Sequence, residues 1–213
     1  MFREDVQSQC ILSFCVRMFL LPLKKKVNMV DKEIIKRIKS DFFALRNGEI
    51  ADRLRKAGSP YKIIFGLQIP QLEQIAAKLE PSAELAAALW DNTSTRESRL
   101  LATMVYPKSD FNLDMAKKWS EESDTVELID MLCFRLVRYV DGAMSLVDDK
   151  YKSSSGKERY FAFRLAMNLL VLGRIENVDC LYSMAKAEYA KNVPSTKSIA
   201  FQIIEEIDFL KEK

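Results

Sequence analysis

Histidine is absent from the sequence, and its four cysteines include no CxxC pair. Zinc sites are built from clusters of cysteine and histidine, and the Ser-His-Asp and Cys-His nucleophile systems need an imidazole, so the sequence argues against the first and excludes the second. GxGxxG, P-loop and HExxH segments are also missing. We therefore expect no metal and no cofactor. Unpaired cysteines fit a reduced, cytoplasmic protein.

Glycine and proline are scarce, with 6 of each in 213 residues. A β-sandwich or barrel would need more tight turns than this composition supplies, so long helices are favoured over strands. Hydrophobic residues make up 48% of the chain, which is enough to bury a substantial core and excludes a disordered protein. The composition predicts an all-α fold.

An apolar run over residues 10–23 is followed by Lys24, Lys25 and Lys26. This run is too short to span a bilayer, and a signal peptide carries its basic residues before the apolar core, not after it. We interpret residues 1–28 as an N-terminal extension to which the sequence assigns no role. Residues 29–213 are expected to form a single domain, with no membrane contact.

Apolar residues recur at helical spacing after Asp31, beginning with Ile34, Ile35 and Ile38. Asp31 is a good helix cap, and Pro70 suits the first position of a helix. The connector 61–67 is where extended backbone is expected. The spacing predicts at least nine helices after Asp31 and no sheet of three or more strands. They are expected over 34–47, 50–56, 70–79, 81–90, 95–106, 112–119, 125–139, 142–151, 157–173, 177–191 and 195–210.

The expected helices group into pairs whose first members begin near residues 70, 94, 123, 157 and 195. Units of this length fall near or below the range of HEAT and tetratricopeptide repeats. Adjacent pairs with short connections stack on their neighbours. This favours a curved solenoid of helical hairpins, with a generic helical bundle as the alternative.

Charge is unevenly distributed, although the net charge is only +3. Basic residues outnumber acidic ones over 24–62 and 135–174, whereas 121–130 contains acids and no bases. Three of those acids, Asp124, Glu127 and Asp130, recur at three-residue spacing, which places them near one stripe of a helix. Such a stripe either binds a cation or stabilises developing positive charge, or it is the solvated face of an amphipathic helix.

Two stretches resemble a known family. The first reads YKIIFGLQIPQLEQIA over 61–76, and the second joins Leu89 and Trp90 to RESRLLA over 96–102. Both are similar to patterns of the AlkD-type DNA alkylation repair family, and the resemblance runs from Asp31 to the C-terminus. It implies HEAT-like helical pairs forming a C-shaped, positively charged cleft for duplex DNA. Active members of that family excise positively charged N-alkylated purines.

The resemblance also implies site residues. The family places a tryptophan and an aspartate four residues apart at the start of a central helix, an arginine in a later helix and a second tryptophan in the last. These positions fall here on Ser123, Glu127, Arg164 and Phe201. Glu127 would stabilise positive charge on the sugar, Arg164 would hold a phosphate, and Phe201 would keep an aromatic face that Ser123 lacks.

The repeat pattern supports this set, because Glu127, Arg164 and Phe201 fall near the second turn of first-member helices in consecutive units and should share one surface. The alternatives are structural: Glu127 as a helix N-terminal acid and Phe201 as a core residue. Further candidate phosphate contacts are Arg99, Arg135, Arg138, Lys157 and Arg159.

Two functional hypotheses follow. In the first, the chain is a monomeric DNA-binding protein of the AlkD type whose partner is duplex DNA, and it either excises cationic N-alkylpurines slowly or has lost that activity. In the second, it is a helical-repeat scaffold that binds a protein or unusual DNA structures through its concave face. A continuous positive cleft favours the first, and an apolar or mixed groove favours the second.

Overall fold

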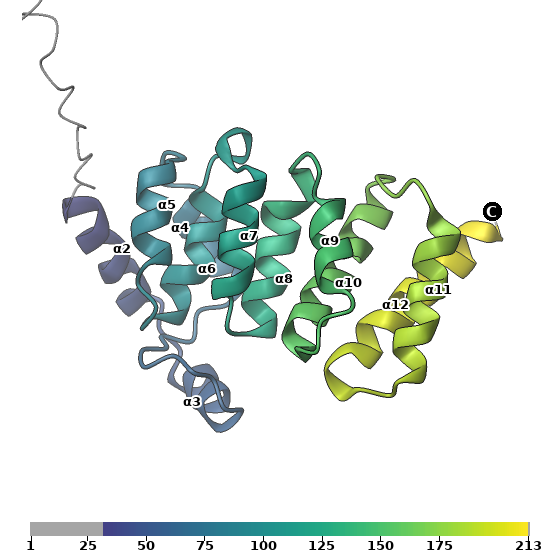
Figure 1. Ribbon diagram of the computed structural model, residues 1–213. Helices are drawn as coiled ribbons and strands as arrows, with labels where there is room; N and C mark the ends of the chain where they lie inside the picture. The colour runs from purple at the N-terminus through teal and green to yellow at the C-terminus, as the bar shows by residue number, and fades with distance from the viewer. Residues whose placement is uncertain (1–31, 213) are drawn as a thin grey trace, which may run out of the picture.

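The computed structural model describes residues 32–212 (Figure 1). This part of the chain contains eleven α-helices, two short 3₁₀ helices and no strand, which confirms the expected all-α class and helix number. Ile63 and Thr95 form one isolated parallel bridge at the connector where extended backbone was expected. The extension 1–28 and the expected cap Asp31 lie outside the described residues. The elements are α2 Lys32–Ala44, α3 Gly48–Lys56, α4 Ile69–Ala76, α5 Ala83–Trp90, α6 Arg96–Val105, η1 Lys108–Asp110, α7 Leu113–Glu122, α8 Val126–Arg135, η2 Val137–Tyr139, α9 Met144–Lys150, α10 Gly156–Val171, α11 Val178–Ala190 and α12 Pro194–Lys211.

Most helices begin at a polar residue whose side chain accepts a hydrogen bond from the first turn, and this sets the boundaries locally. The capping residues are Asn47, Ser82, Asn112, Thr125, Ser155 and Asn177. The expected helix over 125–139 is interrupted at Leu136, whose backbone (φ −126°, ψ −63°) leaves the helical region. The chain continues there as the 3₁₀ helix η2.

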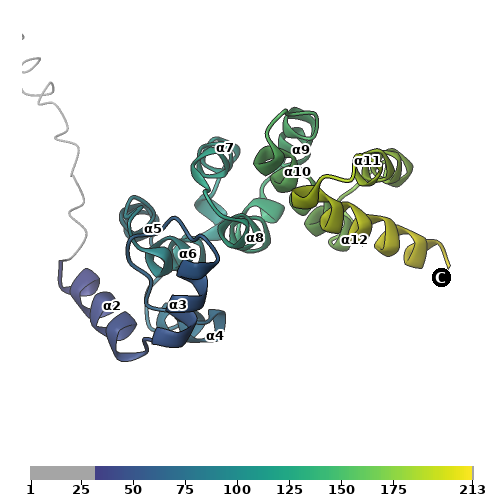
Figure 2. The same ribbon diagram turned by 90° about the horizontal axis from the view of Figure 1, so that it is seen from below.

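The helices form two layers that follow an arc (Figure 2). Helices α5, α7, α9 and α11 make the outer layer, and α6, α8, α10 and α12 make the inner layer on the hollow side of the arc. Within the inner layer each helix packs against the next. This is the curved, HEAT-like solenoid that the sequence predicts.

The pairing of helices differs from the expected one by one helix. The close hairpins are α5 with α6, α9 with α10 and α11 with α12. Inner-layer helices are therefore second members of their hairpins, not first members. The expectation that their equivalent positions share one side of the molecule is unaffected, because α8, α10 and α12 still lie side by side.

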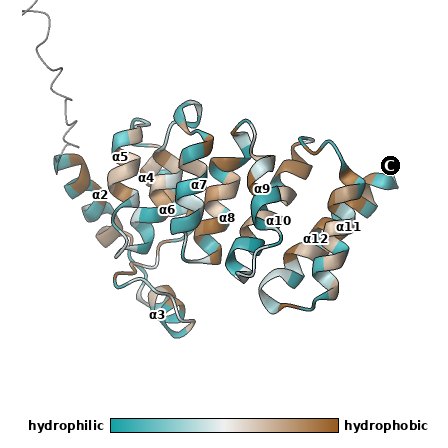
Figure 3. Cartoon of the chain, in the orientation of Figure 1, coloured by the Kyte–Doolittle hydropathy of each residue, from teal (hydrophilic) through white to brown (hydrophobic). Residues whose placement is uncertain are grey.

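Both layers share one apolar core. Most helices carry hydrophobic residues beside hydrophilic ones, as helices with one buried face do (Figure 3). In the N-terminal half the core centres on Trp90 of α5 and Trp119 of α7, whose rings stack at 3.9 Å and 4°. Tyr106 and Phe111 meet the Trp119 ring edge-on, each at 5.4 Å. These contacts fix α5 against α7 in the outer layer.

Gly66 allows the connector between α3 and α4 to pass close to α3. Its φ is +81°, and a Cβ added there would lie 2.2 Å from the backbone oxygen of Asn47 and 2.9 Å from the nitrogen of Ala51. Gly58 has a similar φ of +84°, but an added Cβ meets nothing within 4 Å. The two glycines therefore have the same left-handed backbone conformation, but only at Gly66 would a side chain collide with neighbouring atoms.

We expect Gly66→Ala to destabilise the protein by at least about 3 kcal/mol, because the left-handed backbone and the backbone overlap both oppose a side chain. Gly58→Ala should cost only about 1–2 kcal/mol, from the backbone conformation alone. Urea unfolding followed by circular dichroism measures both. Equal losses would show that the approach of the connector to α3 does not constrain the fold.

Candidate nucleic-acid interface

Three of the four family-derived positions lie on neighbouring inner-layer helices. Glu127 is in the first turn of α8, Arg164 is in the middle of α10 and Phe201 is in α12. Because α8 packs against α10 and α10 against α12, these residues belong to successive helices of the inner layer. Ser123 follows the last residue of α7.

Ser123 is fully buried, and its hydroxyl donates to the carbonyl oxygen of Trp119 at 2.7 Å. Ser123 therefore caps the C-terminal end of α7 within the core and is not part of the inner surface. A ring at this position would have to displace the surrounding core.

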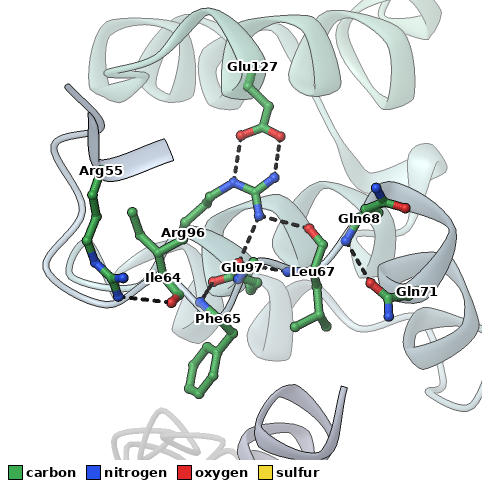
Figure 4. Close-up of polar contacts among 10 residues, drawn as sticks. Arg55, Ile64, Phe65, Leu67, Gln68, Gln71, Arg96, Glu97 and Glu127 are labelled. Carbon is green, nitrogen blue, oxygen red and sulfur yellow. Dashed lines mark hydrogen bonds and ion pairs between the residues drawn. The ribbon is translucent and has the colours of Figure 1, made fainter. Parts of the chain in front are cut away.

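Glu127 is the partner of a buried arginine. Arg96, at the start of α6, donates from Nε to Oε2 of Glu127 at 2.7 Å and from Nη2 to Oε1 (Figure 4). The Arg96 side chain is almost completely buried, whereas the Glu127 side chain is 37% exposed. Burial opposes the charged form of Arg96, but the hydrogen bonds and charges of Glu127 and Glu97 outweigh it and raise the Arg96 pKa. Both carboxylate oxygens of Glu127 are thus committed to one guanidinium.

The same guanidinium reaches the connector. Nη1 of Arg96 donates to the carbonyl oxygen of Leu67 at 2.9 Å and to Oε1 of Glu97 at 2.8 Å. Glu97 is fully buried and accepts the backbone N–H groups of Phe65, Gly66 and Leu67 at 3.1, 2.9 and 3.4 Å (Figure 4). In the sequence, Arg96 and Glu97 stood out only as part of the family pattern. Their role in joining the connector to α6 and α8 could not be seen there.

The other two acids of the α8 stripe also face arginines. Asp124 lies 3.2 Å from Nη1 of Arg99 on α6, and Asp130 lies 2.7 Å from Nε of Arg164 on α10. The stripe is therefore more than a solvated face, because each of its acids pairs with an arginine. It joins α8 to both neighbouring inner-layer helices through ion pairs.

Arg164 takes part in a three-residue cluster. Tyr160, one turn earlier in α10, donates its hydroxyl to Oδ1 of Asp130 at 2.8 Å and accepts from Nη2 of Arg164 at 2.9 Å. Burial, together with the nearby Asp130 carboxylate, raises the pKa of Tyr160 to about 12, so its proton is held in this bond at physiological pH. The Arg164 side chain remains 23% exposed.

Phe201 is 43% exposed, so it is a surface aromatic and not a core residue. Its ring lies 5.7 Å from that of Tyr189 at the end of α11. The Nζ of Lys197, one turn earlier in α12, lies 5.4 Å from the Tyr189 ring centroid. A cation and two aromatic rings thus gather where α11 and α12 meet.

The candidate phosphate contacts divide into two groups. Arg99 is buried under Trp90, at 4.2 Å from its ring centroid, and Arg159 pairs with the buried Glu188 at 2.9 Å. Both side chains contact other residues of the protein. The structure therefore does not present them to a phosphate, which differs from the expectation. The other three, Arg135, Arg138 and Lys157, keep some exposure.

Arg135 pairs with Glu73 of α4, and Arg138 lies 4.0 Å from the Phe134 ring centroid. Phe134 is exposed and is seven residues, or two helical turns, after Glu127, on the same face of α8. Basic and aromatic side chains therefore continue the inner face beyond the acid stripe. Within residues 32–212, no group of histidine, cysteine, aspartate and glutamate side chains could hold a metal ion. No helix in the same range is long and apolar enough to cross a membrane.

The two curved layers of helical hairpins define a HEAT-like repeat protein. Over residues 38–186 the sequence matches the model of the DNA alkylation repair enzyme family, and the chain belongs to that family. Its fold is similar to a solved structure described as a new family of proteins related to the HEAT-like repeat DNA glycosylases, with affinity for branched DNA structures. The TM-score is 0.68 at 16% identity, with 79% of this chain and 73% of that chain covered. No protein of curated function matches the sequence.

We expect Glu127→Gln to destabilise the fold by about 2 kcal/mol, because an amide cannot balance the charge of buried Arg96 and accepts only one of its two bonds. The partial exposure of Glu127 keeps this below the loss typical of fully buried pairs. Asp114→Asn, at an exposed acid of α7, is the matched control and should change stability by less than about 0.5 kcal/mol. Urea titration of both variants tests this, and equal stabilities would rule out Glu127 as the structural partner of Arg96.

Proposed function

We propose that this protein binds duplex DNA along its inner layer and acts in, or derives from, the repair of alkylated bases. The observation that carries the proposal is the partly exposed side chain of Arg164 on α10, followed on the next inner helix by the exposed ring of Phe201. A guanidinium suits a phosphate oxygen, and an aromatic face suits a base or a sugar. Membership of the DNA alkylation repair enzyme family supports the same ligand.

Excision, by contrast, lacks a free carboxylate. Breaking the glycosidic bond of an alkylated purine develops positive charge on the sugar, which a nearby anion must stabilise. The acids of the stripe, Asp124, Glu127 and Asp130, are each already paired with an arginine. Their negative charge is largely neutralised, and the enclosed Ser123 offers no ring to a cationic base. Binding without fast excision is the function that this geometry supports best.

Branched DNA is a second candidate ligand, favoured by one observation. The similar solved structure is described as belonging to proteins with affinity for branched DNA structures. A four-way junction presents the same phosphates as a duplex, so both ligands would use Arg164. Direct competition between a junction and a duplex of equal length ranks the two.

We expect binding to duplex DNA at low salt that weakens steeply as salt rises, because phosphate contacts release counterions. Arg164→Ala should weaken binding about tenfold on unrelated sequences alike and lower the salt slope by about one. Lys186→Ala, at an exposed cation of outer-layer helix α11, is the control and should leave both unchanged. Fluorescence anisotropy over a salt series measures both quantities.

Equal effects of Arg164→Ala and Lys186→Ala would place the DNA surface elsewhere on the protein. If no DNA is bound at low salt, a helical scaffold for a protein partner becomes the better reading.

Release of N-methylated purines from alkylated duplex DNA is expected to be slow or undetectable, and neutral lesions should not be released. Any residual excision would depend on the part of its negative charge that Glu127 keeps beside Arg96, so Glu127→Gln should abolish it with little change in DNA affinity. Single-turnover assays with Asp114→Asn as control test this, after circular dichroism has confirmed that each variant is folded. Efficient release that survives Glu127→Gln would contradict the role given to this residue.

A further inference from the structure

An apolar groove lies at the N-terminal end of the solenoid, between α2, α5 and the connector 61–68. Its volume is about 620 Å³, and its walls include Ile35 and Phe43 of α2, Ile63 and Phe65 of the connector, and Leu89 of α5. Phe43 is 59% exposed and Ile63 is 41% exposed. Large apolar side chains gathered around one groove usually mark a surface that another apolar group covers.

The groove is separate from the proposed DNA surface. Its walls come from α2, the connector, α5, the α5–α6 turn and the first turn of α6, whereas Glu127, Arg164 and Phe201 lie on α8, α10 and α12. It also lies where a repeat protein needs a cap, because a terminal repeat has no neighbour to cover its apolar side. The first described residue, Lys32, begins α2, which forms one wall.

The chain itself supplies an apolar segment next to this wall. Residues 10–23 contain only Ser13 and Arg17 as polar side chains other than cysteine. The apolar members include Ile11, Leu12, Phe14, Val16, Met18, Phe19, Leu20, Leu21 and Leu23. Residues 24–31 connect this run to α2, and such a tether reaches roughly 30 Å when extended.

Tethering decides between occupants. A segment held by so short a linker has an effective concentration on the order of millimolar at its site. A second copy of the chain at micromolar concentration competes poorly with it. We propose that residues 10–23 of the same chain dock in the groove between α2 and α5 and cap the N-terminal end of the solenoid.

Native cysteines make the proposal testable in the full-length chain. Cys10 and Cys15 lie in the segment, and Ser94, an exposed serine, lies in the groove wall. In a Ser94→Cys variant, mild oxidation should join the introduced thiol to Cys10 or Cys15 within one chain. Non-reducing electrophoresis and peptide mapping detect the bond. It should be absent when Cys10→Ser and Cys15→Ser are added, and exposed Cys180 on distant α11 should stay reduced.

A second measurement does not depend on disulfide geometry. Docking should shield the introduced thiol from alkylation, and Leu20→Asp with Leu21→Asp should raise its alkylation rate about tenfold by releasing the segment. Ser13→Asp, which adds one charge at a position that is already polar, is the control and should change the rate little. An interchain disulfide, or a rate that the double aspartate leaves unchanged, would overturn the proposal. Neither result would bear on DNA binding.

Discussion

The buried guanidinium of Arg96 holds together parts of the chain that are distant in sequence. Arg96 is the first residue of α6, and its guanidinium donates hydrogen bonds to Glu127 of α8 and to the carbonyl oxygen of Leu67. The neighbouring Glu97 accepts hydrogen bonds from three backbone N–H groups of the connector. A charge this deeply buried is tolerated only when anions and hydrogen bonds surround it. The position of α8 against α6, and the path of the chain into α4, are therefore set by one side chain and its partners.

This arrangement bears directly on function. A carboxylate that anchors an arginine cannot also supply a free negative charge to a reacting sugar, and the same holds for Asp130 opposite Arg164. In the proposed function, cations and aromatic rings of the inner layer would bind DNA, whereas its acids hold helices together. A family member with a reduced capacity for excision would then be expected, because binding and catalysis would draw on different side chains.

Much of the fold could be predicted from local sequence. The apolar spacing, with Pro70 near a helix start, marked most of the helices, and scarce glycine and proline favoured helices over sheets. The sequence could not predict which of its two sequence neighbours each helix forms a hairpin with, since the connections on either side of each helix are similarly short. The candidate site could be predicted only in part, because the family resemblance identifies which residues occupy the site positions but not where their side chains point. The burial of Arg99 depends on Trp90 of another helix, and Glu188, which binds Arg159, is 29 residues away.

The nearest-neighbour packing of the inner layer also has a mechanical consequence. Within the inner layer each helix packs against the next, so a displacement of one inner helix reaches a distant one through the helices between them. The ion pairs from α8 to α6 on one side and to α10 on the other stiffen the middle of this layer. A further ion pair, from Arg159 of α10 to Glu188 of α11, extends this bracing from the inner layer to the outer one at the C-terminal end.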